Sequence, residues 1–120
     1  MKSYTNLEQS KKLAEFLPLE SADMSYRPYR EEGGIPDYES DLCPYRFASW
    51  SGFPCWSLAA LISLMPRIEH MKPFIDLSPK LDSEEVAIYY HSEDSPYIVK
   101  DNLIDACYDM ILKLHEQKLL

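Results

Sequence analysis

Apolar residues recur at helical spacing in three segments of the chain. In the first, residues 5–17, Thr5 and Glu8 form a capping-box pattern that predicts a helix with Thr5 as its N-cap. The second, residues 56–65, is apolar on nearly its whole circumference and predicts a short, centrally buried helix. The third, residues 102–118, has acidic residues at its start and lysines towards its end, as the helix dipole favours. We therefore expect three helices.

Other segments have the alternation or the residue types of β-strands. Residues 45–50 alternate between two faces, and residues 86–91 and 97–100 are rich in β-branched and aromatic residues. The short polar link between the last two predicts an antiparallel hairpin, and residues 73–77 form a further short strand candidate. The whole pattern predicts a single α+β domain over residues 1–120, with three helices packed on a small, mainly antiparallel sheet.

A stretch near residues 25–42 breaks both patterns. It mixes tyrosine, proline, glycine and acidic residues without a period, which predicts a long variable loop. A long irregular loop in a compact domain is either functional or mobile, so a binding surface and a solvated excursion remain open. The chain has 12 basic and 20 acidic residues, a net charge of −8, and no basic cluster. Because phosphate contacts need lysine or arginine, direct binding to nucleic acid is not expected.

Composition narrows the class of protein further. A length of 120 residues suits one domain, and the chain has no apolar run long enough to cross a membrane. Its polar N-terminus lacks the apolar stretch of a secretory signal, which predicts a cytoplasmic protein. Three cysteines without a CxxC pair, and three scattered histidines, predict neither a disulfide framework nor a metal site. No cofactor is expected.

Cys55 is the one candidate nucleophile. It precedes a tryptophan at the predicted start of the central helix, where the helix dipole lowers the pKa of a thiol. His91 at the end of a predicted strand is the candidate base, and Asp101 or Asn102 could orient it. The order of a cysteine on a helix, a histidine on a strand and a polar residue on a strand is that of minimal papain-like folds.

Other features favour Cys55 as a core residue. Papain-like enzymes place a glutamine shortly before the cysteine, and this chain has glutamine only at positions 9 and 117. Phe53 and Pro54 crowd the position, and the helix that follows is predicted to be buried. Free cysteine packs readily as a small apolar residue. A papain-like cysteine hydrolase using Cys55 and His91 therefore stays the alternative interpretation.

Three segments, TNLEQSKKLAEFLPLESADM, FPCWSLAALISLMP and DNLIDACYDMILKL, resemble in this order a small-protein family of gut bacteria and of their phages and mobile elements. The family has no established activity, so the resemblance implies a phage or mobile-element context and a set of framework residues. These are Leu13, Ala22, Asp23, Met24, Trp56, Leu58, Leu61, Pro66, Asp105, Ala106 and Cys107.

The sequence thus predicts a non-enzymatic module that binds a protein partner through its variable acidic surface. Tyrosine and arginine are favoured interface anchors. The candidate partner-binding residues are Tyr26, Arg27, Tyr29, Arg30, Tyr38 and Tyr45. A virion or assembly component is a weaker alternative, because the sequence contains neither a heptad pattern nor a repeat. The sequence leaves the partner's identity and the oligomeric state open.

Overall fold

The computed structural model describes residues 3–26, 42–44, 53–77, 85–91 and 96–120. These residues contain three α-helices and six short strands, and the strands form two antiparallel sheets. The predicted α+β class is confirmed, although the strands belong to two small sheets and not to one. The chain divides into two compact units, residues 4–60 and residues 61–120 together with 1–3. One domain over residues 1–120 stays a prediction.

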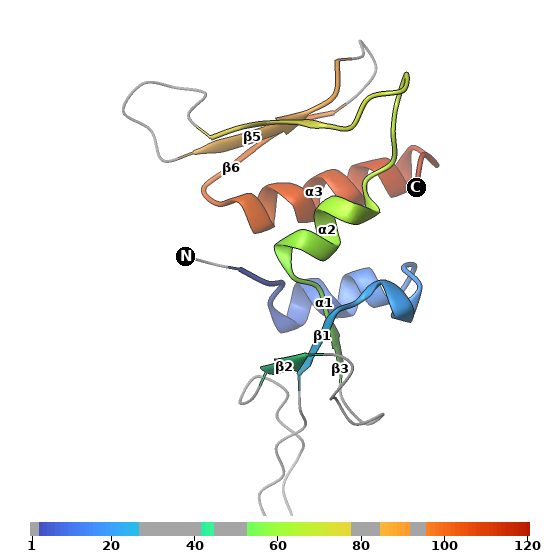
Figure 1. Ribbon diagram of the computed structural model, residues 1–120, viewed down its shortest axis with the longest axis vertical. Helices are drawn as coiled ribbons and strands as arrows, with labels where there is room; N and C mark the ends of the chain where they lie inside the picture. Colours follow the sequence, from blue (N-terminus) through green and yellow to red (C-terminus); the bar gives the residue numbers. More distant parts are fainter. Residues whose placement is uncertain (1–2, 27–41, 45–52, 78–84, 92–95) are drawn as a thin grey trace, which may run out of the picture. The chain divides into compact units, whose positions relative to one another are not determined.

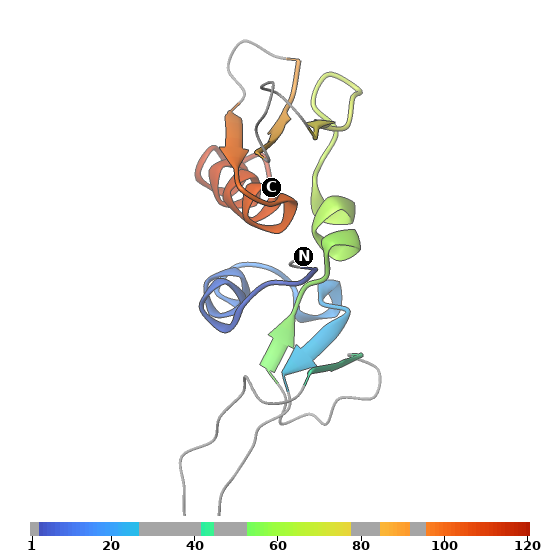
Figure 2. The ribbon, with the colours of Figure 1, turned by 90° about the vertical axis from the view of Figure 1, so that its left-hand side faces the viewer.

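The unit of residues 4–60 combines one helix with a three-stranded sheet. Helix α1 spans Leu7–Ala14 and is followed by a single 3₁₀ turn, Leu19–Ser21. Strand β1 (Met24–Tyr26) lies between β2 (Leu42–Pro44) and β3 (Phe53–Cys55) and is antiparallel to both, and α1 packs against β3 (Figure 2). The expected strand over residues 45–50 and most of the expected loop lie outside the described residues.

The N-cap of α1 corrects the prediction by one residue. Asn6, not Thr5, caps the helix: its Oδ1 accepts from Gln9 N at 2.8 Å, and Gln9 Oε1 accepts from Asn6 N at 3.0 Å. Thr5 and Asn6 are both good caps, and each has an acidic or amide side chain three residues later. The sequence pattern therefore does not show which of the two residues is the N-cap. Tertiary contacts decide between them, because Thr5 is fully buried and its side chain is used in the core.

The unit of residues 61–120 is a three-stranded antiparallel sheet with one helix on it. Strands β4 (Phe74–Asp76), β5 (Val86–Tyr89) and β6 (Tyr97–Lys100) lie in the order β4–β5–β6, which confirms the predicted hairpin and the short strand before it. Helix α3 runs along one face of this sheet (Figure 1).

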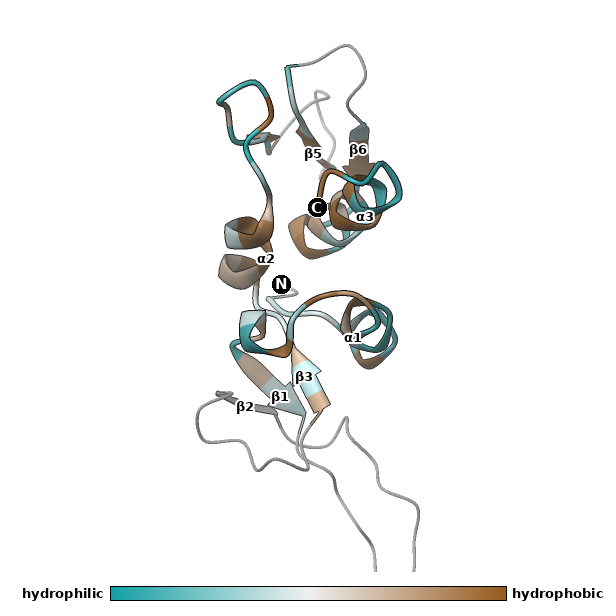
Figure 3. Cartoon of the chain, turned by 90° about the vertical axis from the view of Figure 1, so that its right-hand side faces the viewer, coloured by the Kyte–Doolittle hydropathy of each residue, from teal (hydrophilic) through white to brown (hydrophobic). Residues whose placement is uncertain are grey.

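Helix α3 (Leu103–Glu116) confirms the third predicted helix. Asn102 caps it by accepting from Asp105 N at 2.9 Å, while its own amide donates to the Asp105 carboxylate at 2.8 Å. Apolar residues lie on one side of the helix and polar residues on the other (Figure 3), and the apolar side is buried. The buried residues are Ile104, Ala106, Cys107, Met110, Ile111 and Leu114.

Helix α2 (Leu58–Leu64) is shorter and more exposed than its composition predicts. Its first turn is capped by Ser57, whose Oγ accepts from Ala60 N at 3.2 Å. Leu61 is its one buried residue, and Ala59 and Ser63 are exposed. The predicted burial on all sides is therefore wrong, because two turns present only one side to a core. Within the described residues, no helix combines the length and apolar character that a membrane span requires.

Candidate functional site

Cys55, the candidate nucleophile, is the last residue of strand β3, and its side chain is fully buried. The sequence places it at a helix N-terminus, but α2 begins only at Leu58. This corrects the electrostatic argument for reactivity, because the effect of a helix dipole is confined to the terminal turn. The thiol lies instead in the interior of its unit.

Thr5 holds this thiol in a buried hydrogen-bond network. Cys55 Sγ donates to the Thr5 carbonyl oxygen at 3.3 Å, and the Tyr26 hydroxyl donates to the same oxygen at 2.6 Å. Thr5 Oγ1 lies 2.7 Å from Ser10 Oγ and accepts from Trp56 N at 3.2 Å. We call these five residues the Thr5 network. It ties the segment before α1 to β1 and β3, so Cys55 has a structural task.

Burial also makes the thiol a poor nucleophile. Desolvation is the main cause that raises the pKa of Cys55, and the negative charge of Asp23 raises it slightly further. Hydrogen bonds from Thr5, Ser10 and Tyr26 only partly offset that rise. Cysteine attacks as a thiolate, and reactive cysteines have lowered pKa values in partly exposed, electropositive sites. Cys55 is instead fully buried, and its pKa is raised.

We expect iodoacetamide at pH 8 to label Cys55 at least about 100-fold more slowly in the folded protein than in urea, because labelling requires local opening. Mass spectrometry of the Cys55 peptide over time measures the rate. Cys107, also buried, is the internal control and should be protected to a similar degree. Labelling of Cys55 as fast in the folded as in the unfolded protein would contradict the structural role.

His91 and Asp101, the proposed partners of Cys55, belong to the other compact unit. His91 follows β5, is exposed, and packs edge-on against Phe74 with ring centroids 4.4 Å apart. Asp101 is exposed, and Asn102, its alternative, is committed to the cap of α3. Cys55 therefore lies in one unit and its proposed partners in the other, and Asn102 already has a structural task.

Of the candidate partner-binding residues, Tyr26 alone lies within the described part of the chain. It is 5% exposed, and its hydroxyl is bonded to Thr5, so it belongs to the core and not to the expected binding surface. Arg27, Tyr29, Arg30, Tyr38 and Tyr45 lie outside the described residues.

Two framework segments are joined by polar contacts that spacing alone does not reveal. The Asp23 carboxylate accepts from Ser57 N at 2.9 Å and from the Ser57 hydroxyl. The Trp56 indole donates through Nε1 to Ser21 Oγ at 3.0 Å. The turn after α1 thus holds the chain as it leaves β3. These hydrogen bonds give Trp56 and Ser57 a structural role, although an indole N–H and a hydroxyl are also groups that bind ligands in other proteins.

The sheet β4–β5–β6 carries a row of aromatic side chains across all three strands. Phe74 pairs with Tyr89, and Tyr89 pairs with Tyr97. The ring centroids are 5.8 Å and 5.2 Å apart, and His91 lies 5.6 Å from Tyr89. We call these four residues the aromatic cluster. Tyr97 is 58% exposed and His91 is exposed, so the cluster reaches the surface.

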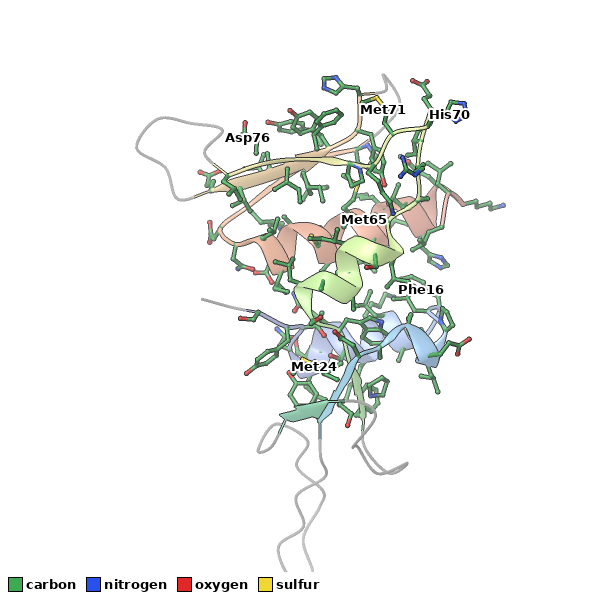
Figure 4. All side chains as sticks on the ribbon, viewed as in Figure 1. Phe16, Met24, Met65, His70, Met71 and Asp76 are labelled. Carbon is green, nitrogen blue, oxygen red and sulfur yellow. The ribbon has the colours of Figure 1, made fainter. Side chains whose placement is uncertain are left out.

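The aromatic cluster lies on the face of the sheet opposite α3. Along β5, Val86 and Ile88 lie on the face opposite to that of Tyr89, and both are buried. Lys100, which pairs with Val86, forms a 2.9 Å salt bridge to Asp109 of α3, so the helix covers the Val86 face. Asp76, on the same face as Phe74 by alternation, lies on the side of the sheet away from α3 (Figure 4). The sequence does not reveal the aromatic cluster, because its formation depends on how β4, β5 and β6 are paired residue by residue.

No group of three or more histidine, cysteine, aspartate or glutamate side chains suited to a metal ion occurs among the described residues. Comparison with family models, with curated proteins and with solved structures finds no match to this chain.

Proposed function

We propose that this protein is a non-enzymatic module that binds a partner protein, and that the aromatic cluster is part of its binding surface. The observation that carries the proposal is Tyr97, which is 58% exposed yet packed against Tyr89 at the outer face of the sheet. Tyrosine is enriched at protein interfaces and among the residues whose truncation costs most binding energy.

The packing of the cluster supports this role energetically. Tyr97 contacts Tyr89, which in turn contacts Phe74 and His91, so the rings support one another before any partner arrives. A side chain that is already ordered loses less entropy on binding. A regular sheet is also a more rigid platform than a loop.

Arg27, Tyr29, Arg30, Tyr38 and Tyr45 remain part of the proposed binding surface on the strength of their composition. The resemblance to a family of phages and mobile elements leads us to propose a host-cell protein as the partner. The alternative function, a cysteine hydrolase, is not supported by the described contacts, since Cys55 is buried and has a raised pKa.

We expect Tyr97→Ala to weaken partner binding at least about tenfold, because truncation removes an exposed interface ring. The partner is first captured on immobilised wild-type protein from a host lysate, and its affinity for each variant is then measured by surface plasmon resonance. Tyr97→Phe keeps the ring and should bind nearly as well as the wild type.

Tyr4→Ala is the matched control, because Tyr4 is another exposed tyrosine, 40% exposed, in the other unit. It should leave the affinity unchanged. Equal affinities of Tyr97→Ala and the wild type would remove the aromatic cluster from the interface. Failure to capture any protein that binds the wild type would overturn the proposed function itself.

A further inference from the structure

Strand β4 and its flanks form an exposed apolar edge. Met71, Ile75 and Leu77 are 45%, 38% and 64% exposed; Ile75 is the middle residue of β4, Leu77 directly follows the strand, and Met71 lies three residues before it. Among the described strands, β4 pairs with β5 alone, so its other side is a sheet edge. Such an edge can accept another extended chain through main-chain hydrogen bonds.

A pocket of about 370 Å³ opens beside this edge. Its lining is mostly apolar and comes from the end of α2 and from the segment that leads into β4. The lining residues are Ile62, Ser63, Met65, Lys72, Pro73 and Ile75. Lys72 contributes the one charged group of this lining, and its Nζ donates to the Met65 carbonyl oxygen. The volume is at the lower end of ligand sites, about 300–1,000 Å³, and suits an apolar side chain.

The two faces of β4 offer different chemistry. Ile75 lines the pocket and pairs with the buried Ile88, whereas Phe74 and Asp76 point to the face of the aromatic cluster. Side chains of a strand added to β4 would alternate in the same way. One side chain would enter the pocket, and its two neighbours would lie over Phe74 and beside Asp76.

The net charge of the protein indicates which side chains fit on either side of the apolar one. Residues 61–120 hold six basic against eleven acidic residues, and the whole chain has a net charge of −8. A lysine or arginine side chain is attracted by this excess of negative charge, to which Asp76 of β4 contributes. A second copy of this chain has the same net charge of −8, so like-charge repulsion disfavours it.

We infer that β4 accepts an extended segment of a partner protein as an additional strand. The segment places an apolar side chain in the pocket beside Ile75 and basic side chains on the face of the sheet that carries Phe74 and Asp76. This inference rests on the proposed function and specifies the chemistry of its partner.

A nine-residue peptide in which arginine and leucine alternate is the test probe, and the full-length protein is titrated with it by NMR. A peptide of the same composition, with all its arginines before its leucines, controls for non-specific attraction. We expect the alternating peptide to bind at least about tenfold more tightly and to shift the protein's amide resonances mainly at residues 74–76. Equal affinities of the two peptides would overturn the inference.

Two variants test the pocket in different ways. Ile75→Lys adds a repelling charge, and Ser63→Phe fills the pocket from an exposed position of α2 without a change of charge. Each should weaken the alternating peptide at least about tenfold. Leu19→Lys changes a residue that is 52% exposed in the other unit and should have no effect. Unchanged affinity in both pocket variants would refute the site.

Two further results separate this inference from the proposed function. If the captured partner still binds Ile75→Lys but not Tyr97→Ala, the β4 site is wrong and the proposed function stands. Sedimentation equilibrium shows whether the protein self-associates. A wild-type dimer that Ile75→Lys converts to a monomer would replace the partner segment with a second copy and overturn the inference.

Discussion

Replacing Trp56 with alanine is expected to lower the free energy of unfolding by about 3–5 kcal/mol, the range for truncating a buried aromatic residue. Trp56 is fully buried and is the largest such side chain among the described residues. The truncation leaves a cavity and deprives Ser21 Oγ of the hydrogen bond that it accepts from the indole. Urea unfolding followed by circular dichroism measures the loss.

Trp56→Phe separates the two contributions. It keeps most of the buried ring but removes the Nε1 donor to Ser21, so we expect a smaller loss of about 1–3 kcal/mol. Tyr4→Ala, a change at an exposed ring, should cost less than about 0.5 kcal/mol. A loss below about 1 kcal/mol for Trp56→Ala would contradict its place in the core.

Stability is expected to fall steeply as the pH rises from 9 to 12. Burial raises the pKa of Cys107 on α3 from 9.0 to about 12. Above pH 9 the unfolded thiol loses its proton while the folded thiol keeps it, so the folded state binds more protons and is progressively disfavoured. At about 1.4 kcal/mol per pKa unit, Cys107 contributes a loss of up to about 4 kcal/mol by pH 12. Burial also raises the pKa of Tyr90 to about 12, with the same sign between pH 10 and 12.

Urea titrations at pH 8.5, 10 and 11.5 measure this dependence. Cys107→Ala removes the titrating group, so its free energy of unfolding should start about 1 kcal/mol lower and then fall less steeply with pH than that of the wild type. Tyr90→Phe should flatten the curve above pH 10, although it also loses the hydrogen bond from the Tyr90 hydroxyl to the Pro66 carbonyl. A slope in Cys107→Ala as steep as in the wild type would contradict the assignment to this thiol.

The features that the sequence predicts well are local ones. Helix α3 follows from its apolar spacing and from Asn102, and the β5–β6 hairpin follows from two β-rich segments joined by a short polar link. In each case the residues that determine the element are close to one another in the sequence. Their spacing can therefore be recognised without the tertiary structure.

The tertiary structure corrects the predictions that depended on long-range contacts. Adjacent Thr5 and Asn6 are both acceptable caps, and the choice falls to Asn6 because Thr5 is drawn into the core by Trp56 and Cys55. Cys55 has the sequence setting of a nucleophile but the surroundings of a core residue. Tyr26 has the composition of an interface residue, yet its hydroxyl reaches a buried carbonyl 21 positions away.

The sequence by itself determined the α+β class, helices α1 and α3, the β5–β6 hairpin and the acidic charge, since local periodicity and composition specify these properties. Only the tertiary structure decided which polar groups are buried together, and that Phe74, Tyr89 and Tyr97 form one row next to β4, which is an edge strand among the described strands. The physical reason is that strand register and burial arise from contacts between distant segments. A shift of one residue in register would turn the same side chains to the opposite face.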